Sequence, residues 1–373
     1  MLKDSKIPNF LYPVFILGFF GVSIQVYLSD WSTEDWRKIV ILAIVAFLAG
    51  YFFSRQKANV AWNFSIITAI VSFLLLVVVL SLPEIRNIRS WIQIGSFTFQ
   101  PSELAKVGLI VGNSVILGGR NGRGLGPLKG FFFCSVINLL VFYLLSLQPE
   151  VGTVIVMAGI TWLQVLCSKV SKFFSVLLPV LAIGVFFIGG LKLMPVYEKV
   201  LNSYQAKRIE TFFLGEESSS DDRYQIEQAH FQIAKGGLWG SGFSEDVKEE
   251  LHYLPERQND LVIAVFSRAG GLFLVLIVIG LYLWSSLGAL NFSQKIPSET
   301  AKQLVIGFAG YMACHCLFNV GVALELIPTT GFPLIPLSQG GSGWISLGCL
   351  VGLLLSVLSG YGNLYNSKVV GGK

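Results

Sequence analysis

The stretch LPERQNDLVIAVFSRAGGLFLVLIVIGLYLW (residues 254–284) changes from a polar segment to a long apolar run at Asp260. The run is long enough to cross a bilayer, since a transmembrane helix needs about 20 predominantly apolar residues. Asp260 lies at the N-terminal end of this predicted helix, and Arg268 lies inside it. The stretch predicts a membrane protein and raises the question of what a carboxylate does at this boundary.

The rest of the chain has the same character. Of its 373 residues, 53% are hydrophobic and only 13% are charged, a composition that indicates several spans. We expect an all-α polytopic membrane protein with about ten transmembrane helices, forming a single membrane domain over residues 1–373. The predicted spans are 10–28, 38–53, 60–82, 103–119, 130–148, 150–167, 173–193, 260–287, 303–326 and 343–363.

The basic residues predict the orientation. Thirteen Lys and Arg lie in the loops and tails on one side of the spans, and three lie in the short loops on the other. Lys and Arg concentrate on the cytoplasmic side of membrane proteins. We therefore expect both termini in the cytoplasm and one large extracytoplasmic loop, residues 194–259, between the seventh and eighth spans. The net charge of +5 is explained by this topology, and it gives no case for nucleic-acid binding.

Four acids lie inside or at the ends of predicted spans: Glu103, Glu150, Asp260 and Glu325. Charged residues within the bilayer are costly and commonly functional, although a position near a helix end that reaches water is an alternative for each. All four lie toward the outer face on the predicted topology. This predicts a polar cavity that opens outward.

The external loop has its own pattern. Residues 223–243 place apolar residues at helical spacing and stop at Gly236-Gly237, which predicts an amphipathic helix at the membrane surface. The glycines of KGGLWGSG (235–242) fit either a flexible turn or a phosphate-binding loop. Arg89 and Arg208 lie beside apolar or aromatic residues, where an Arg can hold a phosphate. In the ninth span, Cys314-His315-Cys316 is interpreted as buried residues rather than a metal site, because adjacent helical positions point apart.

Five segments together resemble one family. They are RSWIQIGSFTFQPSELAK (89–106), QPEVGT (148–153), YQIEQAHFQIAKGGLWGSG (224–242), LPERQNDLVIAV (254–265) and IPTTGFPLIPLSQGGSG (327–343). They are similar to signature segments of the SEDS family (shape, elongation, division and sporulation), in the family's order. QPEVGT and the short termini favour its RodA type over its FtsW type.

The resemblance implies an enzyme of the bacterial cytoplasmic (inner) membrane. It would be an inverting peptidoglycan glycosyltransferase that polymerises lipid II at the outer face, together with a class B penicillin-binding protein. By resemblance, Asp260 falls on the family's essential acidic position. The candidate substrate-binding residues are Arg89, Glu103, Lys106, Glu150, Arg208, Gln228 and Ser338.

Several positions depart from the family's pattern. They are Ser90, Asn259, Arg268, Ala269, Glu325 and Gln339. We expect Arg268 to pair with Glu325, near the outer end of the next span. Gly307 and Gly310 form a smooth stripe that we predict to be either the partner's docking face or a site of internal packing.

The implied reaction needs a base near the attacking hydroxyl and positive charge at the departing pyrophosphate. Asp260 suits the first role, and Arg89, Lys106 and Arg208 suit the second. A divalent cation held by Asp260, Mg or Mn, is an alternative. Two other functions are open on sequence grounds: a flippase for the lipid-linked precursor, which would use the same embedded charges, and a scaffold for a partner enzyme.

Overall fold

The computed structural model is an α-helical bundle with a small unit at one end, which is called the external unit because it lies outside the bundle. The structure describes residues 7–29, 35–83, 89–95, 97–119, 126–148, 150–170, 220–328 and 331–370. The predicted seventh span and the part of the external loop before residue 220 lie outside these ranges.

Nine of the ten predicted spans correspond to helices in the described residues. Their bounds are α1 Tyr12–Leu28, α2 Asp35–Arg55, α3 Ala58–Val79, α4 Pro101–Gly118, α5 Pro127–Ser146, α6 Val151–Leu166, α12 Val262–Ser293, α13 Glu299–Ala323 and α14 Gly341–Val370. A 3-10 turn, η1 (Asn9–Leu11), precedes α1. Seven of the described helical segments are long and apolar enough to cross a membrane. Of the other two, α4 carries Glu103 and Lys106, and α6 is short, at 16 residues.

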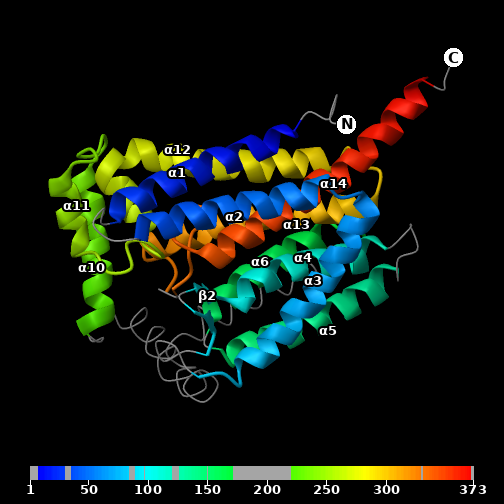
Figure 1. The fold of residues 1–373 in the computed structure, drawn as a ribbon, viewed down its shortest axis with the longest axis horizontal. Coiled ribbons are helices and arrows are strands. Elements are labelled where there is room, and N and C mark those ends of the chain that lie inside the picture. Colours follow the sequence, from blue (N-terminus) through cyan, green and yellow to red (C-terminus); the bar gives the residue numbers. More distant parts are fainter. Residues whose placement is uncertain are drawn as a thin grey trace.

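The helices run alongside one another, and the external unit caps one end of the bundle (Figure 1). This unit contains α10 (Ser220–Gly236) and α11 (Glu245–His252). A two-stranded antiparallel sheet, β1 (Ile92–Ile94) and β2 (Phe97–Phe99), leads into α4. Helix α1 begins and α14 ends at the opposite end of the bundle (Figure 1).

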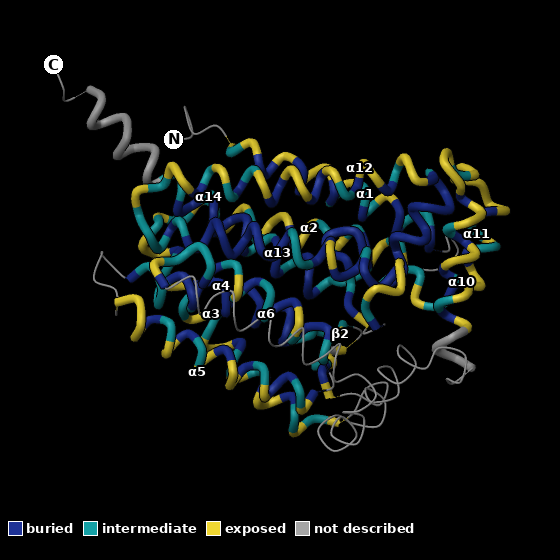
Figure 2. The backbone as a smooth tube through the Cα atoms, turned by 180° about the vertical axis from the view of Figure 1, so that it is seen from behind, coloured by how far each residue is buried: buried dark blue, intermediate teal, exposed yellow. Residues whose placement is uncertain are grey.

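Small residues bring the helices into close contact. An added Cβ on Gly348 of α14 would lie 2.3 Å from the carbonyl oxygen of Ala46 on α2, and one on Gly352 would lie 2.2 Å from that of Gly50. Such small residues four positions apart drive helix packing where lipid supplies no hydrophobic force. Residues exposed along the bundle are mostly on the outward faces (Figure 2), as expected for surfaces that meet lipid.

The stripe of Gly307 and Gly310 packs inside the protein. An added Cβ on Gly307 would lie 2.5 Å from Ile110 of α4, and one on Gly310 would lie 3.2 Å from the Cα of Ile160 on α6. The prediction of a docking face for a partner is therefore wrong here, and the alternative of internal packing is confirmed.

The predicted helix is confirmed as α10, which ends at Gly236, with Gly237 in the left-handed conformation at φ 54°. Its place at the membrane surface stays a prediction. The phosphate-binding alternative for the glycines that follow stays a prediction, but these glycines have a structural role. They allow the chain to approach a break in α12 at Gly271, where φ is 67° and ψ is −171°. An added Cβ on Gly240 would lie 2.2 Å from the carbonyl oxygen of Ala269, so only glycine fits this approach.

Candidate functional site

A buried ion pair lies at the N-terminal end of α4. The helix begins at Pro101, which suits a first helical position because it has no N–H to leave unpaired. Glu103 and Lys106 follow one turn apart, so their side chains meet on one face. Lys106 Nζ contacts Glu103 Oε1 at 2.7 Å, and both side chains are buried.

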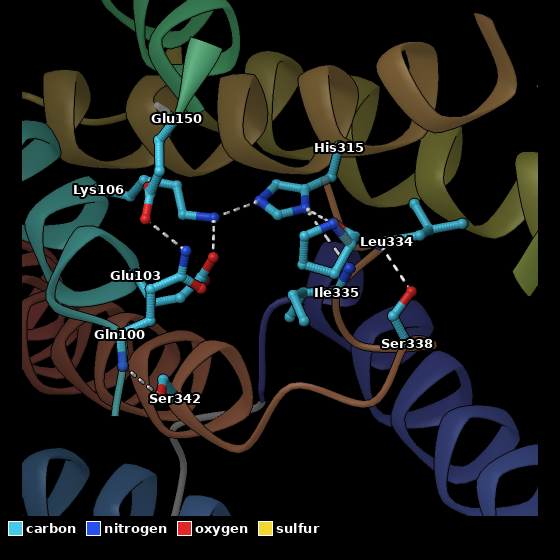
Figure 3. A network of polar contacts seen from close by, with 10 residues as sticks. Gln100, Glu103, Lys106, Glu150, His315, Leu334, Ile335, Ser338 and Ser342 are labelled. Atoms are coloured by element: carbon cyan, nitrogen blue, oxygen red, sulfur yellow. Dashed lines mark hydrogen bonds and ion pairs between the residues drawn. The ribbon is translucent and has the colours of Figure 1, made fainter. Parts of the chain in front are cut away.

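Aromatic rings and a histidine enclose the lysine. Lys106 Nζ lies 3.4 Å from His315 Nε2 on α13 (Figure 3). It also lies 4.6 Å from the ring centroid of Phe332 and 5.6 Å from that of Tyr311. Ring faces attract a cation, and more strongly where water is excluded. The ammonium group is therefore held from several sides within the protein.

Glu150 reaches the same region from the start of α6. Its Oε1 accepts a hydrogen bond from Gln100 Nε2 at 2.7 Å (Figure 3). Ser90 Oγ donates to the carbonyl oxygen of Gln148 at 2.7 Å, which ties the segment before β1 to the segment before α6. Glu150 and Glu103 thus approach one site from two different helices.

The first turn of α14 closes this site. Gln100 N donates to Ser342 Oγ at 3.0 Å, and an added Cβ on Gly343 would lie 2.9 Å from Glu103 Oε2. The first N–H groups of a helix have no partner within the helix and favour a nearby negative charge. The carboxylate of Glu103 therefore lies between Lys106 and the first turn of α14.

Asp260 lies in the turn between α11 and α12 and is buried. Asn319 Nδ2 on α13 donates to its main-chain carbonyl oxygen at 2.7 Å. Ser338 Oγ donates to the carbonyl oxygen of Asn259, and Gln339 N donates to that of Gln258 at 2.7 Å. The backbone around Asp260 is thus fixed by groups from two other parts of the chain.

Residues 331–341 connect the two groups of polar residues. Phe332 contacts Lys106 through its ring, and its carbonyl oxygen accepts from Asn319 Nδ2 at 3.4 Å. His315 Nδ1 lies 3.2 Å from the carbonyl oxygen of Pro333. Asp260 and the Glu103–Lys106 pair therefore share one scaffold, built from α13 and this segment.

The arrangement places buried Asp260, whose residue type can transfer protons, on the same scaffold as the buried Glu103–Lys106 pair. Within the described ranges, no group of three or more His, Cys, Asp and Glu could hold a metal ion. The divalent cation at Asp260 thus stays a prediction.

The structure brings together most of the predicted site residues. Glu103, Lys106 and Glu150 form one group, and Asp260 and Ser338 lie in the adjoining one. Arg89 is exposed beside Ser90, and Gln228 is partly buried on α10. Arg208 lies outside the described residues.

The predicted pairing of Arg268 with Glu325 is wrong. Arg268 Nη2 contacts Glu250 Oε2 of α11 at 2.6 Å, whereas Glu325 Oε1 lies 3.4 Å from His230 Nδ1 of α10. Glu325 is exposed in this contact, so of the four predicted acids it stands apart. The external unit lies beside both spans and provides each residue with a nearer partner.

Sequence reasoning missed His315, Asn319 and Gln100 as parts of the site. A signal was present, because Tyr311, His315 and Asn319 recur every four residues in an otherwise apolar helix. That spacing places them on one face.

Comparisons with known proteins agree on one family. The family model described as "Cell cycle protein" (FtsW, RodA, SpoVE) matches residues 9–361. The probable peptidoglycan glycosyltransferase FtsW of Trichlorobacter lovleyi is 27% identical over 331 residues, covering 87% of this chain and 83% of that protein. The stage V sporulation protein E of Bacillus subtilis is 28% identical over 330 residues, covering 86% of each.

Solved structures show the same fold. A chain from a study of the "structural coordination of polymerization and crosslinking by a peptidoglycan synthase complex" has a TM-score of 0.72 and 23% identity, covering 93% of this chain and 96% of that one. The crystal structure of the rod shape determining protein RodA of Thermus thermophilus has a TM-score of 0.67 and 22% identity, covering 94% and 95%.

Proposed function

The chain belongs to the FtsW, RodA and SpoVE family of cell cycle proteins, and from this membership we infer that it is a peptidoglycan glycosyltransferase of cell-wall synthesis. Relatives that carry this activity in their names align with most of the chain. The fold it shares with RodA includes the bundle that holds the candidate site.

We propose that the substrate is lipid II and that Asp260 acts as the base for the attacking hydroxyl. The observation that carries this role is the position of Asp260, buried but placed outside α12 in the turn that faces the external unit. A carboxylate there is shielded from water, so its charge interacts more strongly with neighbouring groups than it would in bulk solvent. It is also near the boundary at which a lipid-linked sugar meets water. General base catalysis of this kind contributes a factor of about 10² to 10⁴.

Lys106 has a supporting part in this proposal. Its ammonium group is enclosed by Glu103, His315 and Phe332, so in this conformation it positions residues 331–341 rather than facing a pyrophosphate. Arg89, which is exposed, is the better candidate for the leaving pyrophosphate among the described residues. Arg208 stays a candidate on sequence grounds alone.

We propose the same topology as the sequence predicts. The protein lies in the bacterial inner membrane as a single domain, with both termini in the cytoplasm and residues 194–259 outside. The placement of α10 and α11 at the end of the bundle away from the end of α14 supports this orientation (Figure 1).

A class B penicillin-binding protein is the proposed partner. The fold matches a chain from a synthase that coordinates polymerisation with crosslinking, and a polymerase needs such a partner to crosslink its product. Residues Gly307 and Gly310 are excluded as its docking face, because they pack internally.

The decisive experiment is incubation of the purified protein with labelled lipid II, with and without its cognate transpeptidase. We expect glycan chains in at least one of these conditions. Movement of lipid II across vesicles without chain formation would instead support a flippase. If polymer forms only when an active partner is added, and forms equally well when this protein is left out, the result would support a scaffold.

A further inference from the structure

The break at Gly271 separates residues 262–270, called the outer part of α12, from the rest of the helix. At the break, the main-chain groups that lose helical partners bond to the segment 237–242 instead. Four such hydrogen bonds run from Ser241 N to Arg268 O (3.0 Å), Gly242 N to Ala269 O (2.9 Å), Leu272 N to Gly237 O (2.9 Å) and Phe273 N to Leu238 O (3.2 Å). A buried main-chain group without a partner is costly. The segment 237–242 therefore supplies the hydrogen-bond partners that α12 lacks at its break.

Arg268 adds a side-chain bond at the same place. Its guanidinium group is buried and contacts Glu250 Oε2 at 2.6 Å. Lys235, in the last turn of α10, contacts the same oxygen at 2.9 Å and is half-exposed. One carboxylate thus joins α10, α11 and the outer part of α12.

Glu250 and Arg268 lie on either side of Asp260 in the sequence. Arg268 and Glu250 are 18 positions apart, and Asp260 lies between them, in the turn that connects α11 to α12. The contact fixes the two helices on either side of this turn. A change in the angle between them would therefore move Asp260.

The external unit is itself anchored to α1. Tyr27 Oη donates to the carbonyl oxygen of Ser244 at 2.7 Å, and Lys248 Nζ donates to that of Ser29 at 2.9 Å. Because α11 is held on this side, the Arg268–Glu250 pair connects the outer part of α12 to a fixed point.

We propose that Arg268 is a positioning residue for Asp260, acting through Glu250. The proposal rests on the proposed function. It explains why a cation lies inside the span in this chain: a buried charge whose partner is removed is strongly unfavourable, so the pair strongly favours one geometry. A displacement of about 1 Å at a reacting group can cost about 100-fold in rate.

The test compares Arg268→Met, Arg268→Lys and Lys235→Met with the unmodified full-length protein. Arg268→Met removes the charge but keeps the length, and Glu250 still has Lys235. Lys235→Met is the matched control, because it removes a cation from the same carboxylate without touching α12. Two quantities are measured on folded, monodisperse protein: kcat and KM for lipid II polymerisation, and hydrogen–deuterium exchange of residues 254–266.

We expect Arg268→Met to lower kcat at least about 10-fold with KM nearly unchanged, and to speed exchange in residues 254–266 but not in α4. Arg268→Lys should recover part of the loss, and Lys235→Met should stay within about twofold of the unmodified protein. Unchanged exchange in this segment for Arg268→Met would overturn the proposal, whether or not the protein polymerises lipid II. Faster exchange with unchanged kcat would also overturn it. An unmodified protein that makes no polymer would count against the proposed function, and exchange alone would then decide whether Arg268 fixes this segment.

Discussion

Asn319 Nδ2 donates a hydrogen bond to the main-chain carbonyl oxygen of Asp260 at 2.7 Å, and both residues are buried. The bond joins the last residue of the polar face of α13 to the turn before α12. It fixes the backbone of the candidate base without involving its carboxylate. The position of the candidate base is therefore held through its main chain by a neutral group.

Asn319→Leu should destabilise the protein by about 1–3 kcal/mol, because the carbonyl group of Asp260 would be left buried without this donor. Thermal unfolding in detergent measures the effect. The matched control is Gln303→Leu on the same helix. The amide atoms of Gln303 are buried and have no hydrogen-bond partner among the described residues, so its removal should leave the unfolding temperature unchanged or raised. Equal losses for the two variants would contradict the role given to Asn319.

The Glu103–Lys106 pair should behave as a unit. Glu103→Gln leaves the buried ammonium of Lys106 without its carboxylate, which should cost about 3–5 kcal/mol. The double variant Glu103→Gln, Lys106→Met removes both charges and should regain much of this stability. Polymerisation should stay low in the double variant, because Lys106 no longer holds Phe332 and the segment 331–341.

Thermal unfolding of both single variants and the double variant supplies the cycle. Additive losses in the double variant would show that the two charges do not depend on one another. The control is Asp35→Asn and Lys38→Met on α2, an exposed pair at the same spacing with a contact of 3.3 Å. Exposed pairs contribute at most about 1 kcal/mol, so this cycle should show little coupling.

Much of the fold follows from the sequence because a bilayer imposes a simple rule on helix length and polarity. The second and sixth predicted spans are short or polar at an end, and both form helices, α2 and α6. The break at Gly271 was not predicted, because two adjacent glycines are compatible with an unbroken transmembrane helix. In the structure the break coincides with the approach of residues 237–242, which are distant in the sequence, and the sequence pattern of α12 alone does not reveal this contact.

The charged residues of the candidate site are predictable from the sequence, but their pairings are predictable only where both partners lie on one helix. Embedded charges are expensive, so Glu103, Lys106 and Asp260 are conspicuous in an apolar chain. Spacing along a helix identifies the partner of Lys106, which lies one turn away. It says nothing about which other helix lies alongside, and for that reason the partner of Arg268 was predicted wrongly.

The ion pair at Glu250 predicts a dependence of stability on pH. The hydrogen bond from Arg268, and then that from Lys235, hold the pKa of Glu250 below its ordinary value of 4.5. A carboxylate with a lowered folded-state pKa stabilises the fold above its unfolded pKa, and this contribution is lost as the pH falls through the folded value. Glu250→Gln should thus unfold at a lower temperature than the unmodified protein at neutral pH. The gap should close as the pH falls below about 4.5. A gap that is constant across this range would contradict the assignment.

Topology can be tested with reporters. The excess of Lys and Arg on one side predicts that a fusion after Lys373 and an insertion between α4 and α5 report the cytoplasm. An insertion near Ser219 should report the outside. A cytoplasmic signal at Ser219 would place the external unit, and Asp260 with it, on the wrong side for a lipid-linked sugar.

The strongest test of the site is Asp260→Asn. A carboxylate just before a helix can serve only as a cap, and Asn would then replace it with little loss. In the structure, however, the helix begins at Val262 and the N-cap position is occupied by Leu261, whose side chain makes no capping hydrogen bond. Asp260 therefore precedes the cap. We expect Asp260→Asn to keep the unfolding temperature and to lower polymerisation of lipid II by about 100-fold or more, the range of a lost general base. Asp246→Asn, the same change at an exposed position on α11, should leave polymerisation unchanged. Near-normal polymer from Asp260→Asn would show that the buried carboxylate of this turn takes no proton in the reaction, and the base would have to be sought elsewhere on the outer face.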